Sequence, residues 1–351
     1  MPQAFSTDHS QSKNTKNTTK YGVTVLQDFM TERGMSTVDL LSLEEADLDT
    51  YLEDFYANIR NQKSDTYKKN TLLSIRQSLN RYFRDSGKKF DIIKDPTFTK
   101  ANNCFKALLR KTRIDGKGFV KHHDAISVPD IRKMYNHEFL FNANTPMGLV
   151  NKVFFEIVLY FCRRGQENLT ELSVDDFEIV CMDDGRKYVS KCTSELTKNH
   201  QGDSSESEGT GGKMFSTGTD LCPVASFEKY LSKRPQDYNR LFLHPKDAFS
   251  DGDSVWYRKE AMGRDYLGGM MKKYSKTANL SKTYTNHCIR ATCITILNHC
   301  GFESRHITTV SGHRNQQSLA SYCYDTSGMC IHLFNYQNYM YKMYIYTYSC
   351  T

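Results

Sequence analysis

The sequence predicts a mostly α-helical protein with a small β-sheet, an α+β fold arranged as two units. Three observations lead to this prediction. Apolar residues recur at helical spacing through residues 21–113, and residues 148–162 are apolar almost all round, as in a buried helix. Short segments at residues 177–181 and 187–192 have the composition and alternation of strands. At 351 residues the chain is long enough for two domains.

The overall composition indicates a polar, mildly basic protein. The net charge of +7 suits a polyanionic partner such as nucleic acid, but an ordinary soluble protein can carry the same charge. No apolar run reaches the ~20 residues of a membrane span, and no hydrophobic signal core is present at the N-terminus. The 11 cysteines form no Cys-x-x-Cys pair. A zinc site is therefore not expected, and reduced thiols in the cytosol or nucleus are the simplest account.

The first unit is expected to be a helical bundle preceded by an arm. Residues 1–20 lack apolar periodicity and are expected to be disordered. The pattern over residues 21–113 predicts four short helices, two of which carry a basic face. A basic helix face is usually only a solvated surface, but two in one small bundle favour contact with nucleic acid. The residues expected to contact DNA are Lys68, Lys69, Arg76, Lys106, Arg110 and Lys111.

The second unit is expected over residues 127–328, after a linker at residues 114–126 with two glycines and a polar cluster. Its buried helix ends at Arg163 and Arg164. The segment at residues 329–351 is dense in Tyr and Met without regular periodicity, and no function is assigned to it. Besides the strands, the patterns predict helices at residues 223–231, 265–274, 288–299, 304–310 and 317–324, and a short strand or turn at 240–243.

Six polar side chains of the second unit form an ordered set that suits attack on a phosphodiester. This reaction needs a nucleophile, cations that neutralise the non-bridging oxygens, and a proton for the leaving oxygen. Arginine donates paired hydrogen bonds and keeps its charge, lysine and histidine pass protons, and tyrosine can form a covalent phosphotyrosine. In chain order the set is Arg164, Lys198, His287, Arg290, His313 and Tyr322.

Each of these residues also has an ordinary structural explanation when it is taken alone. Arginines at a helix end interact favourably with the helix dipole, and either Arg163 or Arg164 fits the position. His287 fits an exposed helix face, and Gly312-His313 fits a turn. One tyrosine among 22 usually serves packing, and one lysine carries almost no signal. Only the complete set in this order is specific for phosphodiester chemistry.

The order and spacing of the set resemble the catalytic domain of tyrosine recombinases, the phage-integrase family. The segments CRRGQENL, TKNHQG, CPV and SGHRN resemble its eukaryotic, Crypton-type branch and the domesticated domain at the C-terminus of zinc-finger MYM-type and glutamine-rich proteins. The resemblance covers about residues 20–326. The patterns that carry it are Arg-x-x-Glu at residues 164–167, His-x-x-Arg at 287–290, and Gly-His at 312–313 with Tyr322 nine residues after the histidine.

The resemblance implies a helical core-binding domain and a catalytic domain that together clamp duplex DNA. It implies DNA cleavage and rejoining without a metal, a cofactor or ATP. The roles that it implies are phosphate binding for Arg164 and Arg290, protonation of the 5′ oxygen for Lys198, proton acceptance or phosphate binding for His287, a transition-state hydrogen bond for His313, and a 3′-phosphotyrosyl bond for Tyr322.

The chain departs from the family at three places. Ser311 stands where the family usually has Leu, and the loop after Lys198 is long. The resemblance implies a homo-oligomer on DNA, a tetramer in the family, but the segment after Tyr322 does not resemble the helix through which family members assemble. The main expectation is a nuclear DNA recombinase. The alternatives are a domesticated domain that binds DNA or chromatin in a transcription-related role without recombining, and a nickase resembling type IB topoisomerases.

Overall fold

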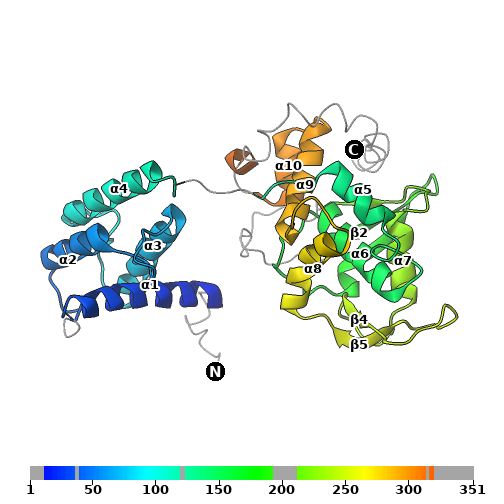
Figure 1. The fold of residues 1–351 in the computed structure, drawn as a ribbon, viewed down its shortest axis with the longest axis horizontal. Helices are drawn as coiled ribbons and strands as arrows, with labels where there is room; N and C mark the ends of the chain where they lie inside the picture. Colours follow the sequence, from blue (N-terminus) through cyan, green and yellow to red (C-terminus); the bar gives the residue numbers. More distant parts are fainter. Residues whose placement is uncertain (1–11, 36–38, 119–122, 193–211, 314–315, 320–351) are drawn as a thin grey trace, which may run out of the picture. The chain divides into compact units, whose positions relative to one another are not determined.

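The structure, a computed structural model, describes residues 12–35, 39–118, 123–192, 212–313 and 316–319 (Figure 1). The chain divides into two compact units after Lys121, a position inside the expected linker. Helices dominate the described part of both units, and the second unit also contains two small antiparallel sheets. The predicted class, mostly α with a small β component, is therefore confirmed.

The first unit is a helical bundle in which α1 packs on α3 and α2 packs on α4. Gly22 allows α1 and α3 to cross closely, since a Cβ atom there would lie 2.6 Å from Ser78 Cβ. Phe55, Phe83 and Phe105 are at most 1% exposed in its core, and burying each contributes roughly 1.5–3 kcal/mol. The elements are α1 (Lys13–Glu32), α2 (Glu45–Asn58), α3 (Lys69–Asp85), the 3-10 helix η2 (Pro96–Phe98) and α4 (Thr99–Ile114).

The expectation of a disordered N-terminal arm is wrong from Lys13 onward, where α1 begins. Residues 1–11 lie outside the described part of the chain. The Ser12 hydroxyl caps the first turn of the helix, and Thr19 accepts a 3.0 Å hydrogen bond from Arg81 Nε of α3. Polar contacts therefore stabilise these first turns, and apolar periodicity could not reveal them.

Helix α6 is the centre of the second unit. All its residues except Met147 are buried, as its nearly continuous apolar sequence predicts, and it packs against α7 and α9. The Thr145 hydroxyl caps it by accepting a hydrogen bond from the Gly148 amide at 3.1 Å. Because both faces of the helix are held, its C-terminal end fixes the position of the chain that follows. The bounds of these helices and of the preceding one are α5 (Val128–Asn136), α6 (Pro146–Tyr160) and α7 (Pro223–Ser232).

The three-stranded sheet lies in the order β1-β2-β3, with antiparallel neighbours. Val189, which is fully buried, pairs with Ile179 on one side and Met214 on the other. The two strands predicted from the sequence are confirmed as β1 and β2. A 3-10 helix, η3 (Val174–Asp176), precedes the strands β1 (Phe177–Cys181), β2 (Lys187–Lys191) and β3 (Met214–Phe215).

The second sheet corrects the prediction for residues 240–243. The strand there is β4 (Leu243–Pro245), and it pairs antiparallel with β5 (Tyr257–Ala261), which the sequence analysis missed. Tyr257 is buried, but the next three residues are exposed, so β5 lacks the alternation that predicts a strand. The register also shifts within β4.

The last helices position the candidate site. Helix α9 packs against α6, α8 and α10, and η4 contacts α10 (Figure 1). Of the helix predicted at residues 317–324, the structure describes only the part within η4, and residues 320–351 lie outside the described part. Within the described ranges, no helix is long and apolar enough to cross a membrane. These elements are α8 (Arg264–Thr277), α9 (Asn286–His299), α10 (Ser304–Ser311) and η4 (Gln316–Leu319).

Candidate functional site

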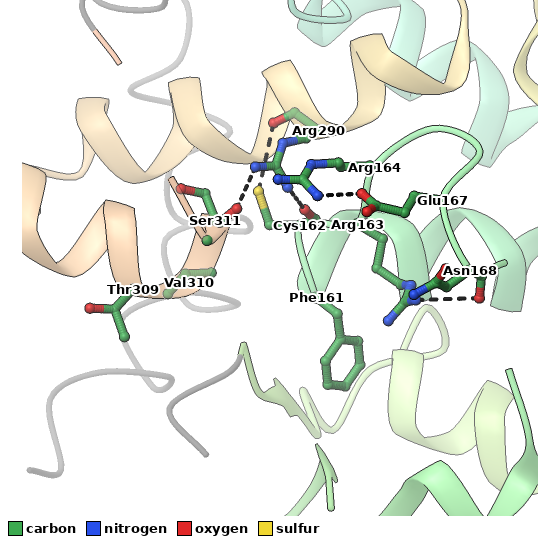
Figure 2. A pocket seen from close by; sticks show the side chains of 11 residues that line it. Phe161, Cys162, Arg163, Arg164, Glu167, Asn168, Arg290, Thr309, Val310 and Ser311 are labelled. Carbon is green, nitrogen blue, oxygen red and sulfur yellow. Dashed lines mark hydrogen bonds and ion pairs between the residues drawn. The ribbon is translucent and has the colours of Figure 1, made fainter. Parts of the chain in front are cut away.

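The turn that follows α6, residues 161–168, presents two arginines and is called the arginine turn here. Arg163 Nη2 donates to the Asn168 carbonyl oxygen at 3.5 Å, whereas Arg164 forms an ion pair with Glu167. Asn168 has a φ of +53°, a left-handed conformation that bends the chain back. Figure 2 shows the two guanidinium groups directed to different acceptors.

Asn286, the first residue of α9, ties the arginine turn to α8 and α9. Its Nδ2 donates to the carbonyl oxygens of Gly165 at 2.9 Å and Leu267 at 2.8 Å. Its Oδ1 accepts a hydrogen bond from the Met271 amide at 3.0 Å. Asn286 is 2% exposed, and its side-chain amide is satisfied by three backbone groups, one in the arginine turn and two in α8. A Cβ atom at Gly165 would lie 2.9 Å from the His287 amide nitrogen, so the turn touches α9 along the backbone.

Replacing Gly165 by alanine is expected to destabilise the second unit by about 1–3 kcal/mol, because the added methyl collides with the α9 backbone. Gly269→Ala is a matched control. Nothing lies within 4 Å of a Cβ added at Gly269, and this residue is inside α8, so alanine should stabilise the protein by about 0.5–1 kcal/mol. Urea unfolding of both variants measures the difference. A Gly165→Ala protein as stable as wild type would contradict the close contact.

Arg290 joins the arginine turn to the end of α10. Its Nη1 donates to the Cys162 carbonyl oxygen and its Nη2 to the Ser311 carbonyl oxygen. Nη2 also lies 3.4 Å from His313 Nδ1. Arg290 is only 7% exposed, and a charge buried to this extent requires such acceptors. These acceptors carry no charge, so the side chain remains a positive centre.

His313 reaches Arg290 because Gly312 ends α10 with a φ of +63°, a conformation that favours glycine. The Nδ1 atom of His313 lies 2.7 Å from Ser311 Oγ. Burial, followed by the charges of Arg290 and Arg164, lowers the pKa of His313 to about 4. The ring is therefore neutral at neutral pH. Because Arg290 can only donate, Nδ1 is the acceptor, which leaves the proton on Nε2.

The stability of the protein is expected to fall as the pH drops from about 6.5 towards about 4. In this window the unfolded chain binds a proton on the imidazole of His313 that the folded chain does not bind, so acid favours unfolding. Urea midpoints at pH 7, 6 and 5 measure the effect. His313→Asn should flatten this part of the profile, and an unchanged profile in that variant would contradict the assignment.

His287 lies on the first turn of α9 and stacks on His123, with ring centroids 5.0 Å apart and an interplanar angle of 24°. His123 Nδ1 in turn lies 3.4 Å from Thr285 Oγ1. Burial first, and then the neighbouring His123 and Arg290, lower the pKa of His287. A neutral imidazole at neutral pH can accept a proton.

Arg164 and Arg290 line one cavity of about 170 Å³ between the arginine turn and the end of α10 (Figure 2). Figure 2 shows Arg164 close to Arg290, while Arg163 extends towards Asn168. The charge of Arg164 also lowers the pKa of His313, and Arg163 lines the same cavity. Among the residues that the structure describes, three arginines and one carboxylate, that of Glu167, line the cavity, which therefore suits an anion.

The structure thus brings together Arg164, Arg290 and His313, and places His287 one helical turn before Arg290. Lys198 and Tyr322, the remaining two residues of the predicted set, lie outside the described residues. The described end of the Lys198 loop, at Gly212, is close to the site. A Cβ atom at Gly212 would lie 2.1 Å from the carbonyl oxygen of Tyr160, the last residue of α6.

The six basic residues expected to contact DNA differ in their surroundings. Arg76 places its guanidinium over the Phe105 ring, 4.6 Å from the ring centroid, and donates to Asn102 of α4. It therefore links α3 to α4 inside the bundle, a role that sequence spacing could not reveal. The other five, at the start of α3 and on α4, are exposed: Lys68, Lys69, Lys106, Arg110 and Lys111.

Sequence reasoning missed two residues of the site. Asn286 directly precedes His287 at a helix start, where an Asn usually indicates a cap, but its amide is used for tertiary hydrogen bonds instead. His123 lies in the expected linker, where no periodicity singles it out. Only the fold brings either residue to the arginines.

Comparisons with known proteins reveal related sequences. A family described as "Domain of unknown function (DUF3504)" matches residues 133–276, and one described as "QRICH1 domain" matches residues 4–112. The human "Uncharacterized protein KIAA1958" is 22% identical over 277 residues, which cover 77% of this chain and 38% of that protein. Human zinc finger MYM-type protein 2 is 24% identical over 255 residues, covering 66% of this chain and 18% of that protein. The chain therefore spans less than two fifths of the length of either relative.

Solved structures resemble the chain over most of its length. The Tn1549 transposon integrase in complex with transposon right end DNA has a TM-score of 0.50 at 14% identity, covering 94% of this chain and 95% of that chain. The same integrase with circular intermediate DNA has a TM-score of 0.50 at 13% identity, covering 94% and 96%. Identities this low show the fold alone. The chain has a recombinase-like fold, as the resemblance in its sequence implies.

Proposed function

We propose that this chain cleaves and rejoins DNA strands through a 3′-phosphotyrosyl intermediate. One observation carries the proposal. Arg164 and Arg290 line a single positively charged cavity, with His313 beside Arg290, in a chain with the recombinase fold. A cavity of this charge suits the phosphate between two nucleotides.

The two arginines would hold the non-bridging oxygens of the scissile phosphate. A guanidinium has five N–H donors, and the two carbonyl contacts of Arg290 occupy only part of them. The Nε2–H of neutral His313 would donate to the same oxygens as their charge grows in the transition state. The lowered pKa of His313 keeps its ring neutral, and the arginines supply the positive charge.

The nucleophile and the acid are assigned from the sequence resemblance. The Tyr322 oxygen would attack phosphorus as the bond to the 5′ oxygen breaks, with Lys198 giving that oxygen a proton and His287 accepting the tyrosine proton. In the reverse step a 5′ hydroxyl attacks the phosphotyrosine and releases Tyr322. Because the phosphotyrosine retains the energy of the broken bond, rejoining needs no ATP.

The proposal includes duplex DNA as substrate, assembly as a homo-oligomer on DNA, a nuclear location and descent from the Crypton-type branch. The exposed cations of the first unit, including Lys69 and Lys106, would bind the DNA backbone. The surroundings of Arg76 indicate instead that it supports the bundle.

A second candidate is a domesticated domain that binds DNA or chromatin without cutting it. The observation that favours it is the similarity to parts of two much longer proteins, KIAA1958 and zinc finger MYM-type protein 2. In that case the arginine site would bind a phosphate but no tyrosine would become linked to DNA.

Covalent trapping separates the two candidates and does not require a defined target sequence. The full chain is incubated with a pool of duplexes that carry a nick within random sequence, so that the short fragment between the break and the nick diffuses away. Denaturation then leaves only covalent complexes. Wild-type protein is expected to retain DNA and Tyr322→Phe to retain none. DNA binding by the wild type without any covalent complex would support the second candidate.

A further inference from the structure

Two buried cysteines meet where the arginine turn packs against α9, and the proposed chemistry does not use them. Cys162 belongs to the turn and Cys293 to α9, one helical turn after Arg290, and they are 1% and 0% exposed. Their thiols are hydrogen-bonded to each other. Cys162 Sγ also lies 4.0 Å from the Arg290 carbonyl oxygen (Figure 2). The two sulfur atoms therefore bridge the junction between α6 and α9.

The surroundings of Cys162 favour its thiolate. The hydrogen bond with Cys293 and the charges of Arg290 and Arg164 lower the pKa of the Cys162 thiol in spite of its burial. By contrast, burial raises the pKa of Cys300. The thiolate is the form that reacts with oxidants, and Cys162 lines the arginine cavity, which a molecule as small as hydrogen peroxide can enter.

Cys162 is also the residue through which the turn holds Arg290. Its carbonyl oxygen accepts the hydrogen bond from Arg290 Nη1, and its φ of +46° is unusual for a residue other than glycine. Such a conformation costs on the order of 1–3 kcal/mol and persists only while its surroundings enforce it. A change at the Cys162 thiol therefore acts on the same residue that positions Arg290.

We propose that Cys162 and Cys293 form a peroxide-sensitive dithiol, and that their disulfide displaces the arginines and so inhibits the reaction at the arginine site. The Cys162 thiolate attacks one oxygen of hydrogen peroxide, the O–O bond breaks and hydroxide leaves, which forms a sulfenic acid. The Cys293 thiol then attacks that sulfur, the S–O bond breaks, and water leaves with the thiol proton. Overall the two thiols lose two electrons and one peroxide becomes two waters. A dithiol reductant restores both thiols by thiol–disulfide exchange and is itself oxidised to a disulfide.

The disulfide would alter the site because it requires the two sulfur atoms to approach to about 2.05 Å, closer than any hydrogen-bonded thiols. This movement draws the strained Cys162 towards α9, and Arg164 follows two residues later. Displacing a catalytic group by about 1 Å can slow a reaction roughly 100-fold. This consequence rests on the proposed function, whereas formation of the disulfide does not.

Peptide mapping tests the dithiol directly. The full chain is treated with hydrogen peroxide, its remaining thiols are blocked, and it is digested without reductant for mass spectrometry. A Cys162–Cys293 peptide is expected in the wild type and in a control that replaces the two cysteines exposed within the described residues, Cys181→Ser/Cys192→Ser. It should vanish in Cys293→Ser and after dithiothreitol. Oxidation of Cys181 and Cys192 while the buried pair keeps free thiols would overturn the proposal.

Covalent trapping on the nicked pool tests the consequence. Peroxide should lower the trapping rate of the wild type roughly 100-fold, and dithiothreitol should restore it. A complete cross-link with an unchanged trapping rate would overturn the claim that the disulfide inhibits the site. A cross-link in a protein that traps no DNA even when reduced would support the dithiol and count against the proposed function. Cys293→Ala serves as a second variant if Cys293→Ser does not fold.

Discussion

Replacing Arg290 by alanine is expected to slow covalent attachment to DNA by about 10²–10³-fold, the effect of removing a donor that stabilises transition-state charge. Binding of duplex DNA should weaken far less, because affinity comes from many cations along the backbone. Trapping rates and gel-shift affinities, measured on the same preparation, provide the comparison. Equal losses of binding and trapping would contradict a role for Arg290 in the transition state.

The same substitution should also destabilise the fold, and a control must separate the two effects. Without Arg290, the carbonyl oxygens of Cys162 and Ser311 lose a donor, at a cost of roughly 1–3 kcal/mol for each group left unsatisfied. Ile131→Ala removes a buried side chain of α5 and should cost about 2–5 kcal/mol. Once folded, this control should trap DNA at close to the wild-type rate, whereas Arg290→Ala should trap it far more slowly.

The largest effect on stability is expected at the buried ion pair of α6. Lys152 Nζ lies 2.7 Å from Glu156 Oε1 and 2.6 Å from Ser226 Oγ, and both charged residues are 1% exposed. The Tyr135 hydroxyl donates to the same Glu156 oxygen at 3.2 Å. Replacing Lys152 by methionine would leave a buried carboxyl without its cation, and should destabilise the protein by about 3–5 kcal/mol in urea unfolding.

A double variant provides the matched control for this pair. In Lys152→Met/Glu156→Leu both charges are gone, so most of the lost stability should return. Burial raises the pKa of Glu156, and the cation opposes that rise. Without Lys152 the carboxyl should bind its proton more tightly in the folded chain, so the single variant should lose stability as the pH rises. A single variant within about 1 kcal/mol of wild type at neutral pH would contradict a large role for the pair.

The sequence predicted the helices whose burial follows one simple pattern. Helix α6 is apolar almost all round and is buried as expected, and the alternation of β1 and β2 identified those strands. Strand β5 was not predicted, because three of its consecutive residues are exposed and the strand therefore lacks alternation. The first turns of α1 were not predicted because they lack apolar periodicity. Polar contacts stabilise them instead, including the cap formed by the Ser12 hydroxyl.

The candidate site was predictable where chemistry limits the choice of residue. Arginine suits phosphate binding best, so Arg164 and Arg290 could be singled out from the ordered set, and both line one cavity. The supporting contacts could not be predicted, because they depend on three-dimensional proximity. Asn286 and Cys162 are ordinary residues in the sequence, and only the meeting of α6 with α9 gives them their roles.

The identity of the residue that becomes linked to DNA tests the proposed mechanism most directly. The measurement is mass spectrometry of the protein after covalent trapping, with the DNA digested to a short nucleotide remnant and the protein digested to peptides. The account predicts a single modified peptide, with the remnant on the Tyr322 oxygen and none in Tyr322→Phe. A remnant on Tyr324, or on any residue other than Tyr322, would contradict the account.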